Sequence, residues 1–209
     1  MTARPASGGG RWVTVSPERL TRWTAGFADR HGSTATAYDE RVVTLTGADG
    51  ALAEIDVPFP PLAGDLVEHV LRERTVGVLL VRLGGHAAGV FQGPRLVSSK
   101  VGSRQVHGRS AAGGWSQQRF ARRREGQVAV ALQAAADVAA RVLLAQPLEA
   151  VAVGGERTAV EAVLADRRLT PLRALVTGRF LDVPDPRHAV LEKAPYRDIW
   201  IRVIDPDQG

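Results

Sequence analysis

Two adjacent glutamines, Gln117 and Gln118, stand in a part of the chain that contains no acidic residue. They follow Gly113 and Gly114 in the stretch HGRSAAGGWSQQRFARRR, residues 107–124. A neutral amide is a poor general base, but its carbonyl and amino groups can orient a water molecule, and nearby backbone N–H groups can stabilise a developing oxyanion. These residue types therefore favour the attack of water on an activated ester, with a partner supplying the rest of the site.

Basic residues surround the glutamines without acidic partners. Residues 74–124 contain no Asp or Glu and carry ten basic residues: Arg74, Arg82, Arg95, Lys100, Arg104, Arg109, Arg119, Arg122, Arg123 and Arg124. Because the whole chain has a net charge of +5 and this segment contributes +10, the remaining residues sum to −5. Such segregation is typical of a protein that binds a polyanion, since guanidinium groups match phosphate oxygens. A solvated basic face is the plainer alternative.

A long helix is predicted directly after this stretch. Residues 117–146 contain no Pro and one Gly, and apolar residues recur from Val128 to Val142 with a helical period, which predicts a helix of about 45 Å. Arg119, Arg122 and Arg123 then share one face. Positive side chains oppose the dipole of a helix N-terminus, so we expect an anion to bind there, close to free backbone N–H groups. A fortuitous surface cluster is the alternative.

Other chemistries lack the residues that they need. The chain has no Cys, and its five His show no spacing typical of metal ligands. No Ser lies in a nucleophile elbow, and the absence of carboxylates excludes acid–base catalysis by Asp or Glu on the basic segment. His107 is either an RNA contact or an ordinary loop residue. Gly154 and Gly155 lack the Lys and Ser/Thr of a phosphate-binding loop, which favours a structural turn. We expect no metal and no cofactor.

The chain is predicted to have three parts. Residues 1–10 are rich in Gly, Ala and Ser and are expected to form a disordered tail. Residues 11–62 are predicted to form a small α+β unit, with a helix from Ser16 and Pro17 to Gly32 and one strand in each of the stretches 34–47 and 51–58. A proline cluster at residues 58–61 marks the boundary with the third part, residues 63–209.

The third part alternates strands and helices. We expect a helix within residues 62–74, strands at 76–83, 87–93 and 95–102, then the flexible loop and the long helix. A strand at 148–155, a helix at 156–167 and strands at 172–183 and 198–205 follow. This order predicts an α/β domain with a mixed sheet and flanking helices. The N-terminus has no apolar run of the length a signal peptide needs, and no run of about 18 apolar residues occurs anywhere, so we expect a cytoplasmic protein that does not enter a membrane. We also expect a monomer.

Residues 107–124, the basic meander before them and the long helix after them resemble the middle domain of archaeal and eukaryotic peptide release factors, whose loop bears Gly-Gly-Gln. The chain is more similar to the release-factor-like peptidyl-tRNA hydrolases of the Vms-type branch, which includes ankyrin-repeat and zinc-finger proteins of ribosome quality control, and to short actinobacterial members of that branch. The stretch TGRFLDVPDPR extends the resemblance, which covers residues 63–205. Trp115 and Ser116 intervene between the glycines and the glutamines, as extra residues do in the Vms-type branch.

The resemblance implies a ribosomal function. Gln117, with Gln118 in reserve, would place water against the ester of peptidyl-tRNA in the peptidyl transferase centre of the large ribosomal subunit, and Gly113 and Gly114 would let the loop fit there. Ribosomal RNA or the tRNA acceptor end would be bound by Lys100, Arg104, His107, Arg109, Arg119, Arg122, Arg123 and Arg124. A non-catalytic factor that binds ribosomal RNA or tRNA, and an RNA nuclease acting near the tRNA 3′ end, are the alternatives.

Overall fold

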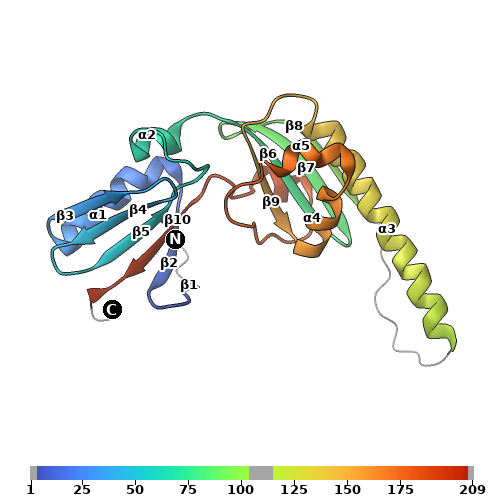
Figure 1. Ribbon diagram of the computed structural model, residues 1–209, viewed down its shortest axis with the longest axis horizontal. Coiled ribbons are helices and arrows are strands. Elements are labelled where there is room, and N and C mark those ends of the chain that lie inside the picture. Colours follow the sequence, from blue (N-terminus) through green and yellow to red (C-terminus); the bar gives the residue numbers. More distant parts are fainter. Residues whose placement is uncertain (1–3, 104–114, 207–209) are drawn as a thin grey trace. The chain divides into compact units, whose positions relative to one another are not determined.

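Two compact units, each a sheet with helices, make up the protein. The computed structural model describes residues 4–103 and 115–206, and the side chains of residues 115–123 lie outside that description. The first unit combines Met1–Arg72 with Arg197–Gly209, and the second is Glu73–Tyr196 (Figure 1). The mixed α/β class is confirmed. The sequence predicted one boundary after residue 62, whereas the units divide after Arg72 and the chain returns to the first unit at Arg197.

An antiparallel six-stranded sheet forms the first unit. Its order is β1 (Arg4–Pro5), β2 (Arg11–Val15), β10 (Ile199–Ile204), β5 (Leu52–Asp56), β4 (Val42–Gly47) and β3 (Thr34–Tyr38). The last strand of the chain, β10, lies between β2 and β5, where Ile201 pairs with both Val13 and Ile55. All three side chains are buried. The predicted strand at 198–205 therefore exists, but it completes the N-terminal sheet instead of the C-terminal domain.

Two α-helices accompany this sheet. A 3-10 turn, η1 (Pro17–Arg19), precedes α1 (Leu20–His31), and α1 buries Leu20 and Phe27 completely. The helix was expected to begin at Ser16 and Pro17; Ser16 makes no side-chain capping bond, and the first turn is 3-10. The second helix, α2 (Leu66–Leu71), is capped by Asp65, whose carboxylate accepts hydrogen bonds from two backbone N–H groups of the first turn.

The N-terminal glycines belong to a hairpin. Residues 4–10 were predicted to be part of a disordered tail, but β1 pairs with β2. Gly8, Gly9 and Gly10 have φ values of 82°, 94° and 77°. The guanidinium of Arg202 donates hydrogen bonds to the carbonyl oxygens of Gly8 and Gly9, at 2.6 and 3.1 Å. The prediction was wrong because the glycines supply left-handed backbone to a turn that a distant strand stabilises.

A four-stranded mixed sheet forms the second unit. Its order is β8 (Arg95–Ser103), β7 (Gly85–Gln92), β6 (Thr75–Arg82) and β9 (Ala150–Gly155). β6 runs parallel to β9 and antiparallel to β7, and β7 pairs antiparallel with β8. The strands predicted at 76–83, 87–93, 95–102 and 148–155 are all present. The strand β8 lies at one edge of the sheet, and the chain passes from it towards the long helix.

Helices cover one face of this second sheet and a mostly irregular segment covers the other. Ala135, Ala139 and Leu143 of α3 (Trp115–Leu143) pack with α4 (Arg157–Leu164) on a core that includes Leu79. By length and composition alone, Arg124–Leu143 would also pass as a membrane span, as core helices of globular units do. The opposite face buries Leu181, Val183, Ala194 and, from α6 (His188–Glu192), Leu191.

The strand predicted at residues 172–183 is not formed. The chain makes a 3-10 turn, η2 (Arg167–Leu169), a short helix, α5 (Thr170–Arg173), and then irregular structure. Only two isolated parallel bridges, Val151 with Val176 and Gly154 with Leu181, join this segment to β9 among the residues described. Pro171 in the first turn of α5 favours helix, and Gly178 with φ of 79° interrupts the extended run, so the alternation of apolar residues does not lead to a ladder.

Gly154 and Gly155, for which the sequence favoured a structural turn, are the last two residues of β9 and pair with Leu80 and Val81 of β6. A Cβ on Gly154 would lie 2.6 Å from the carbonyl oxygen of Leu181, and a Cβ on Gly155, which has φ of 103°, would collide with the carbonyl oxygen of Val81. Both glycines therefore allow close approach of backbone segments.

We predict that Gly155→Ala lowers the free energy of unfolding by about 3 kcal/mol, because the methyl group meets a backbone oxygen and φ is left-handed. Gly126→Ala in α3 is the matched control, since no atom lies within 4 Å of its Cβ position; it should leave stability unchanged or raise it by up to about 1 kcal/mol. Urea unfolding measures both. Equal midpoints for Gly155→Ala and the parent protein would contradict the close approach.

Candidate nucleic-acid interface

The long helix α3 carries its first turns away from the sheet. Among residues whose side chains are described, Ala131 is the first buried one in α3. Trp115 lies sixteen positions earlier, which corresponds to about 24 Å at 1.5 Å per residue. Figure 1 shows the N-terminal part of α3 extending past the strands. Gln117 and Gln118 thus lie at the end of α3 that is remote from the core, and the other end of the helix is part of the core.

Gln117 and Gln118 lie in the first turn of α3 and not in the loop before it. The helix begins at Trp115, two residues earlier than the sequence predicted, and ends at Leu143 instead of Gln146. The helix includes Trp115 and Ser116 because no Pro or Gly lies between Trp115 and Gln118. The first helix-breaking residue towards the N-terminus is Gly114. The first four N–H groups of a helix have no acceptor within it, so the glutamines share this turn with unpaired donors.

Three of the predicted RNA-binding arginines follow within the next turns. Arg119, Arg122 and Arg123 belong to α3, where their spacing places them on one side of the helix. Five other predicted residues lie outside the described part of the chain: Arg104, His107, Arg109, Gly113 and Gly114. The structure therefore brings the glutamines and these three arginines together by their positions on one helix.

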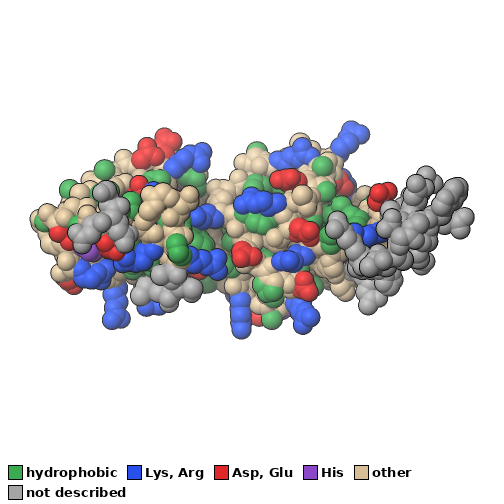
Figure 2. Space-filling model, turned by 90° about the horizontal axis from the view of Figure 1, so that it is seen from below, with side chains coloured by type: hydrophobic (Ala, Val, Ile, Leu, Met, Phe, Trp, Pro, Cys, Tyr) green, Lys and Arg blue, Asp and Glu red, His purple; other side chains and the backbone are tan. Residues whose placement is uncertain are grey.

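Lys100 and Arg124 are the two predicted RNA-binding residues with described side chains. Lys100 is exposed on β8, where it pairs with Ala88, a residue of the core beneath α3. Lys100 therefore lies on the same face of the sheet as α3. Arg124 is partly buried, and its predicted role in RNA binding stays a prediction. Figure 2 shows one face of the protein, on which basic side chains lie among acidic ones instead of forming one unbroken patch.

A buried histidine lies where the chain leaves the sheet. His86 of β7 is 5% exposed and pairs with Gly102, the next-to-last residue of β8. A Cβ on Gly102 would collide with the His86 ring, so the glycine leaves room for the imidazole. Sequence reasoning gave His86 no role, because no spacing distinguishes it from the other histidines. In the described part of the chain, no group of three His, Cys, Asp or Glu residues could hold a metal ion.

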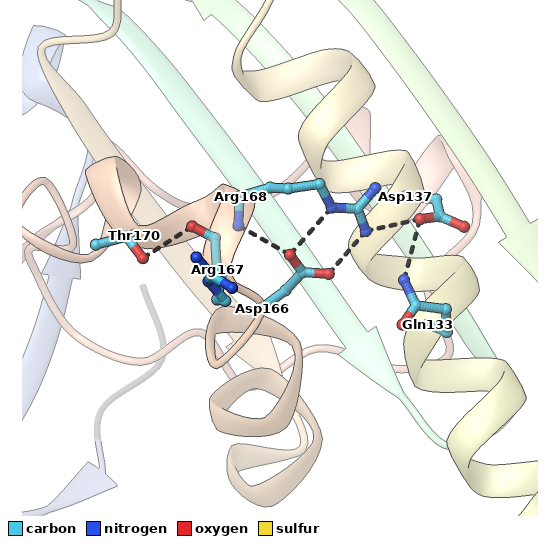
Figure 3. A network of polar contacts seen from close by, with 6 residues as sticks. All are labelled: Gln133, Asp137, Asp166, Arg167, Arg168 and Thr170. Carbon is cyan, nitrogen blue, oxygen red and sulfur yellow. Dashed lines mark hydrogen bonds and ion pairs between the residues drawn. The ribbon is translucent and has the colours of Figure 1, made fainter.

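A polar network connects the C-terminal half of α3 to η2 within the second unit (Figure 3). The Arg168 guanidinium of η2 donates from Nη2 to Asp137 Oδ1 of α3 at 2.7 Å. It also binds Asp166 with two nitrogens, Nε at 3.0 Å and Nη2 at 2.7 Å. Gln133, one turn before Asp137, donates to the same carboxylate at 3.1 Å. These contacts connect α3 to η2 beside the apolar core.

Arg168 lowers the pKa of both carboxyl groups in this network. For Asp137 the main cause is the hydrogen bond from Arg168, followed by the one from Gln133. For Asp166 the causes are the side-chain and then the backbone hydrogen bonds from Arg168, and its pKa lies well below the usual range. Because both folded-state pKa values are lowered, the stabilisation is present above the ordinary pKa of an aspartate and is lost as pH falls through the lowered values.

We predict that Arg168→Met raises the pKa values of Asp137 and Asp166 towards the ordinary aspartate value, because both lose their charged donor. Carboxyl-carbon NMR titration measures the change. Arg167→Met, one residue earlier, removes a charge without touching either carboxylate side chain and should leave both pKa values nearly unchanged. Unchanged titration of both aspartates in Arg168→Met would show that the network does not form.

Comparison with known proteins identifies one family, and sixteen chains of solved structures are similar to this chain. Residues 74–204, more than half of the chain, match the sequence profile of the family described as Actinobacteria/chloroflexi VLRF1 release factor. No curated protein matches the chain. The crystal structure of the archaeal translation termination factor aRF1 is 16% identical with a TM-score of 0.44 over 87% of this chain, which spans 55% of that protein. A structure described as an archaeal protein is 16% identical with a TM-score of 0.33 over 73% of this chain, which spans 50% of it.

Proposed function

Because the chain belongs to the Actinobacteria/chloroflexi VLRF1 release factor family, we propose that it is a ribosome-dependent peptidyl-tRNA hydrolase. It releases nascent chains from stalled large ribosomal subunits in the cytoplasm, in the manner of the Vms-type hydrolases that its loop sequence resembles. The match covers the second unit from Arg74 onward, which includes β8, α3 and the segment between them.

The observation that carries this proposal is the location of Gln117 and Gln118. Both lie in the first turn of α3, about 20 Å along the helix axis from the first buried residue, Ala131. A catalytic group that must reach an ester inside an RNA cavity needs a narrow support, and a single helix is about 10 Å wide. A glutamine on the body of the sheet would lack that reach.

The proposed reaction is hydrolysis of the ester between the peptide and the terminal ribose of tRNA. The water oxygen bonds to the ester carbonyl carbon, and the bond from that carbon to the ribose oxygen breaks. One proton of the water goes to the ribose oxygen, the other is released to solvent, and the peptide leaves with a carboxylate. Gln117 or Gln118 orients the water, and unpaired N–H groups of the first turn of α3 stabilise the oxyanion. No carboxylate of residues 74–124 is available as a base, so the ribosomal site supplies the remaining groups.

Arginines on the same helix support an RNA partner. Arg119, Arg122 and Arg123 add positive charge near a helix terminus that already carries about half a positive charge. Bound phosphates would remove that repulsion, and arginine binds them with two parallel hydrogen bonds. Lys100 is exposed on the sheet face that α3 covers and adds a further basic group on β8.

We predict that Gln117→Ala slows peptide release from stalled complexes of large subunit and peptidyl-tRNA by about 100-fold, the scale expected when a group that stabilises the transition state is lost. Gln118→Ala tests the reserve residue in the same assay. Gln127→Ala, on the same helix but ten residues further along, is the matched control and should release peptide at the parent rate. Parent rates for both Gln117→Ala and Gln118→Ala would reject the catalytic assignment.

The same assay separates the alternatives. A non-catalytic RNA-binding factor would need Arg119, Arg122 and Arg123 for ribosome association but neither glutamine. A nuclease would liberate tRNA that lacks its 3′ CCA end, whereas ester hydrolysis leaves that end intact.

We also predict a steep salt dependence of ribosome association. Each phosphate neutralised by an arginine releases condensed counterions, so changing Arg119, Arg122 and Arg123 to Gln should reduce the slope of log affinity against log salt by about two to three. Sedimentation with large subunits over a range of KCl concentrations measures it. An affinity that does not change from low to physiological salt would contradict the proposed phosphate contacts.

A further inference from the structure

A basic groove runs along η1 and α1 in the first unit. It has a volume of about 340 Å³ and is lined by Arg19, Arg22, Trp23, Gly26 and Arg30, with Thr14 and Val15 of β2 beside them. Positions 19, 22, 26 and 30 succeed one another by three or four residues, so they form one face of the helix. No acidic residue is among those that line the groove.

The three arginines of the groove differ from three other arginines of this unit. Arg11, Arg197 and Arg202 each bind a carboxylate, those of Asp205, Glu18 and Glu54 respectively. Arg19, Arg22 and Arg30 are exposed and make no ion pair or side-chain hydrogen bond with any described residue. Three uncompensated guanidinium groups on one helix face repel one another, which an anionic ligand would relieve.

Trp23 and Gly26 give the groove its shape. Trp23 stacks on the buried Phe27, with ring centroids 5.9 Å apart and planes inclined by 19°, so its indole is held in place beside the arginines. Gly26 is in the middle of α1, where glycine weakens a helix. Core packing does not require it, because a Cβ would meet only the Arg30 guanidinium, at 3.4 Å. The missing side chain leaves open backbone between Arg22 and Arg30.

We propose that this groove binds single-stranded RNA, with Arg19, Arg22 and Arg30 on successive phosphates and a base against Trp23. The arginines extend over about 16 Å of helix, so an extended polyanion contacts all three and a single phosphate ion does not. Aromatic side chains beside basic ones are the combination that binds single strands without reading their sequence. A membrane surface is disfavoured because the indole is recessed in a groove, and insertion needs a protruding apolar face.

Substitution of Gly26 tests the groove without weakening the helix. Gly26→Glu places a carboxylate between Arg22 and Arg30, four residues from each, where it pairs with both and blocks RNA. Glu is a better helix former than Gly, so the thermal midpoint should not fall. Ala25→Glu adds the same charge to α1 at an exposed position that does not line the groove, and it is the matched control.

The binding assay uses the full chain with Arg119, Arg122 and Arg123 changed to Gln, so that α3 contributes less to affinity. Fluorescence anisotropy with a labelled oligouridylate should show affinity about tenfold lower for Gly26→Glu and within about twofold of the parent for Ala25→Glu. NMR should show a shift of the Trp23 indole N–H signal, assigned with Trp23→Phe, when RNA is added. Excess inorganic phosphate and vesicles of phosphatidylglycerol should compete poorly.

Equal losses in Gly26→Glu and Ala25→Glu, or an unshifted indole signal, would overturn the proposal. Competition by phosphate alone would reduce the groove to a general anion site, and competition by vesicles would assign it to a membrane; either result also overturns RNA binding. The proposal does not rest on peptide release, since none of these measurements contains a ribosome. Its failure would leave the role of Gln117 untouched.

Discussion

The close packing of one half of α3 on the second sheet is the constraint on which the other features depend. Ala135, Ala136 and Ala139 are nearly or completely buried against β7 and its neighbours, and their small side chains let the helix axis approach the strands. The Arg168 network with Asp137 adds a polar connection on the side of η2. Only a helix fixed in this way at its C-terminal half can hold its first turn at a defined distance from the core. The long apolar helix is therefore a support, and its length is part of the proposed function.

Local patterns predicted most of the second unit. The apolar run of β6, the turn between β7 and β8, and the helical period after Val128 depend on neighbouring residues, and all three are confirmed. The place of β10 could not be predicted, because its pairing with Val13 and Ile55 joins residues more than 140 positions apart. The hairpin at residues 4–10 was missed for the same reason, since Arg202 stabilises glycines that otherwise resemble a disordered tail. The strand predicted at residues 172–183 was wrong for another reason. Its apolar spacing suits a strand, but Pro171 favours a helical turn and Gly178 interrupts the extended backbone.

The candidate site was predictable to the extent that its residues are close in sequence. Gln117, Gln118, Arg119, Arg122 and Arg123 occupy one continuous stretch, and the structure adds that this stretch is helical from Trp115 and remote from the buried core. Sequence alone could not show the partly buried position of Arg124 or the buried His86 opposite Gly102, because both depend on packing across the sheet. The sequence analysis did not find the groove on α1. Only the structure shows that Arg19, Arg22 and Arg30 line one groove and have no carboxylate partner among the described residues.

Each unit thus carries a cluster of basic residues, in the first turns of α3 in one unit and along α1 in the other. The ion pairs of Arg168 and Arg202 serve stability instead.

The proposed reaction requires the first turn of α3 to contact the ester. Electron cryo-microscopy of the Gln117→Ala and parent proteins on large subunits that carry peptidyl-tRNA would locate this turn. We predict that in the Gln117→Ala complex residues 115–118 lie within a few ångströms of the peptidyl ester, with room for one water molecule. In the parent complex, where the ester is hydrolysed, the same residues should lie beside the tRNA acceptor end. Finding these residues far from any tRNA acceptor end would contradict the proposed hydrolysis.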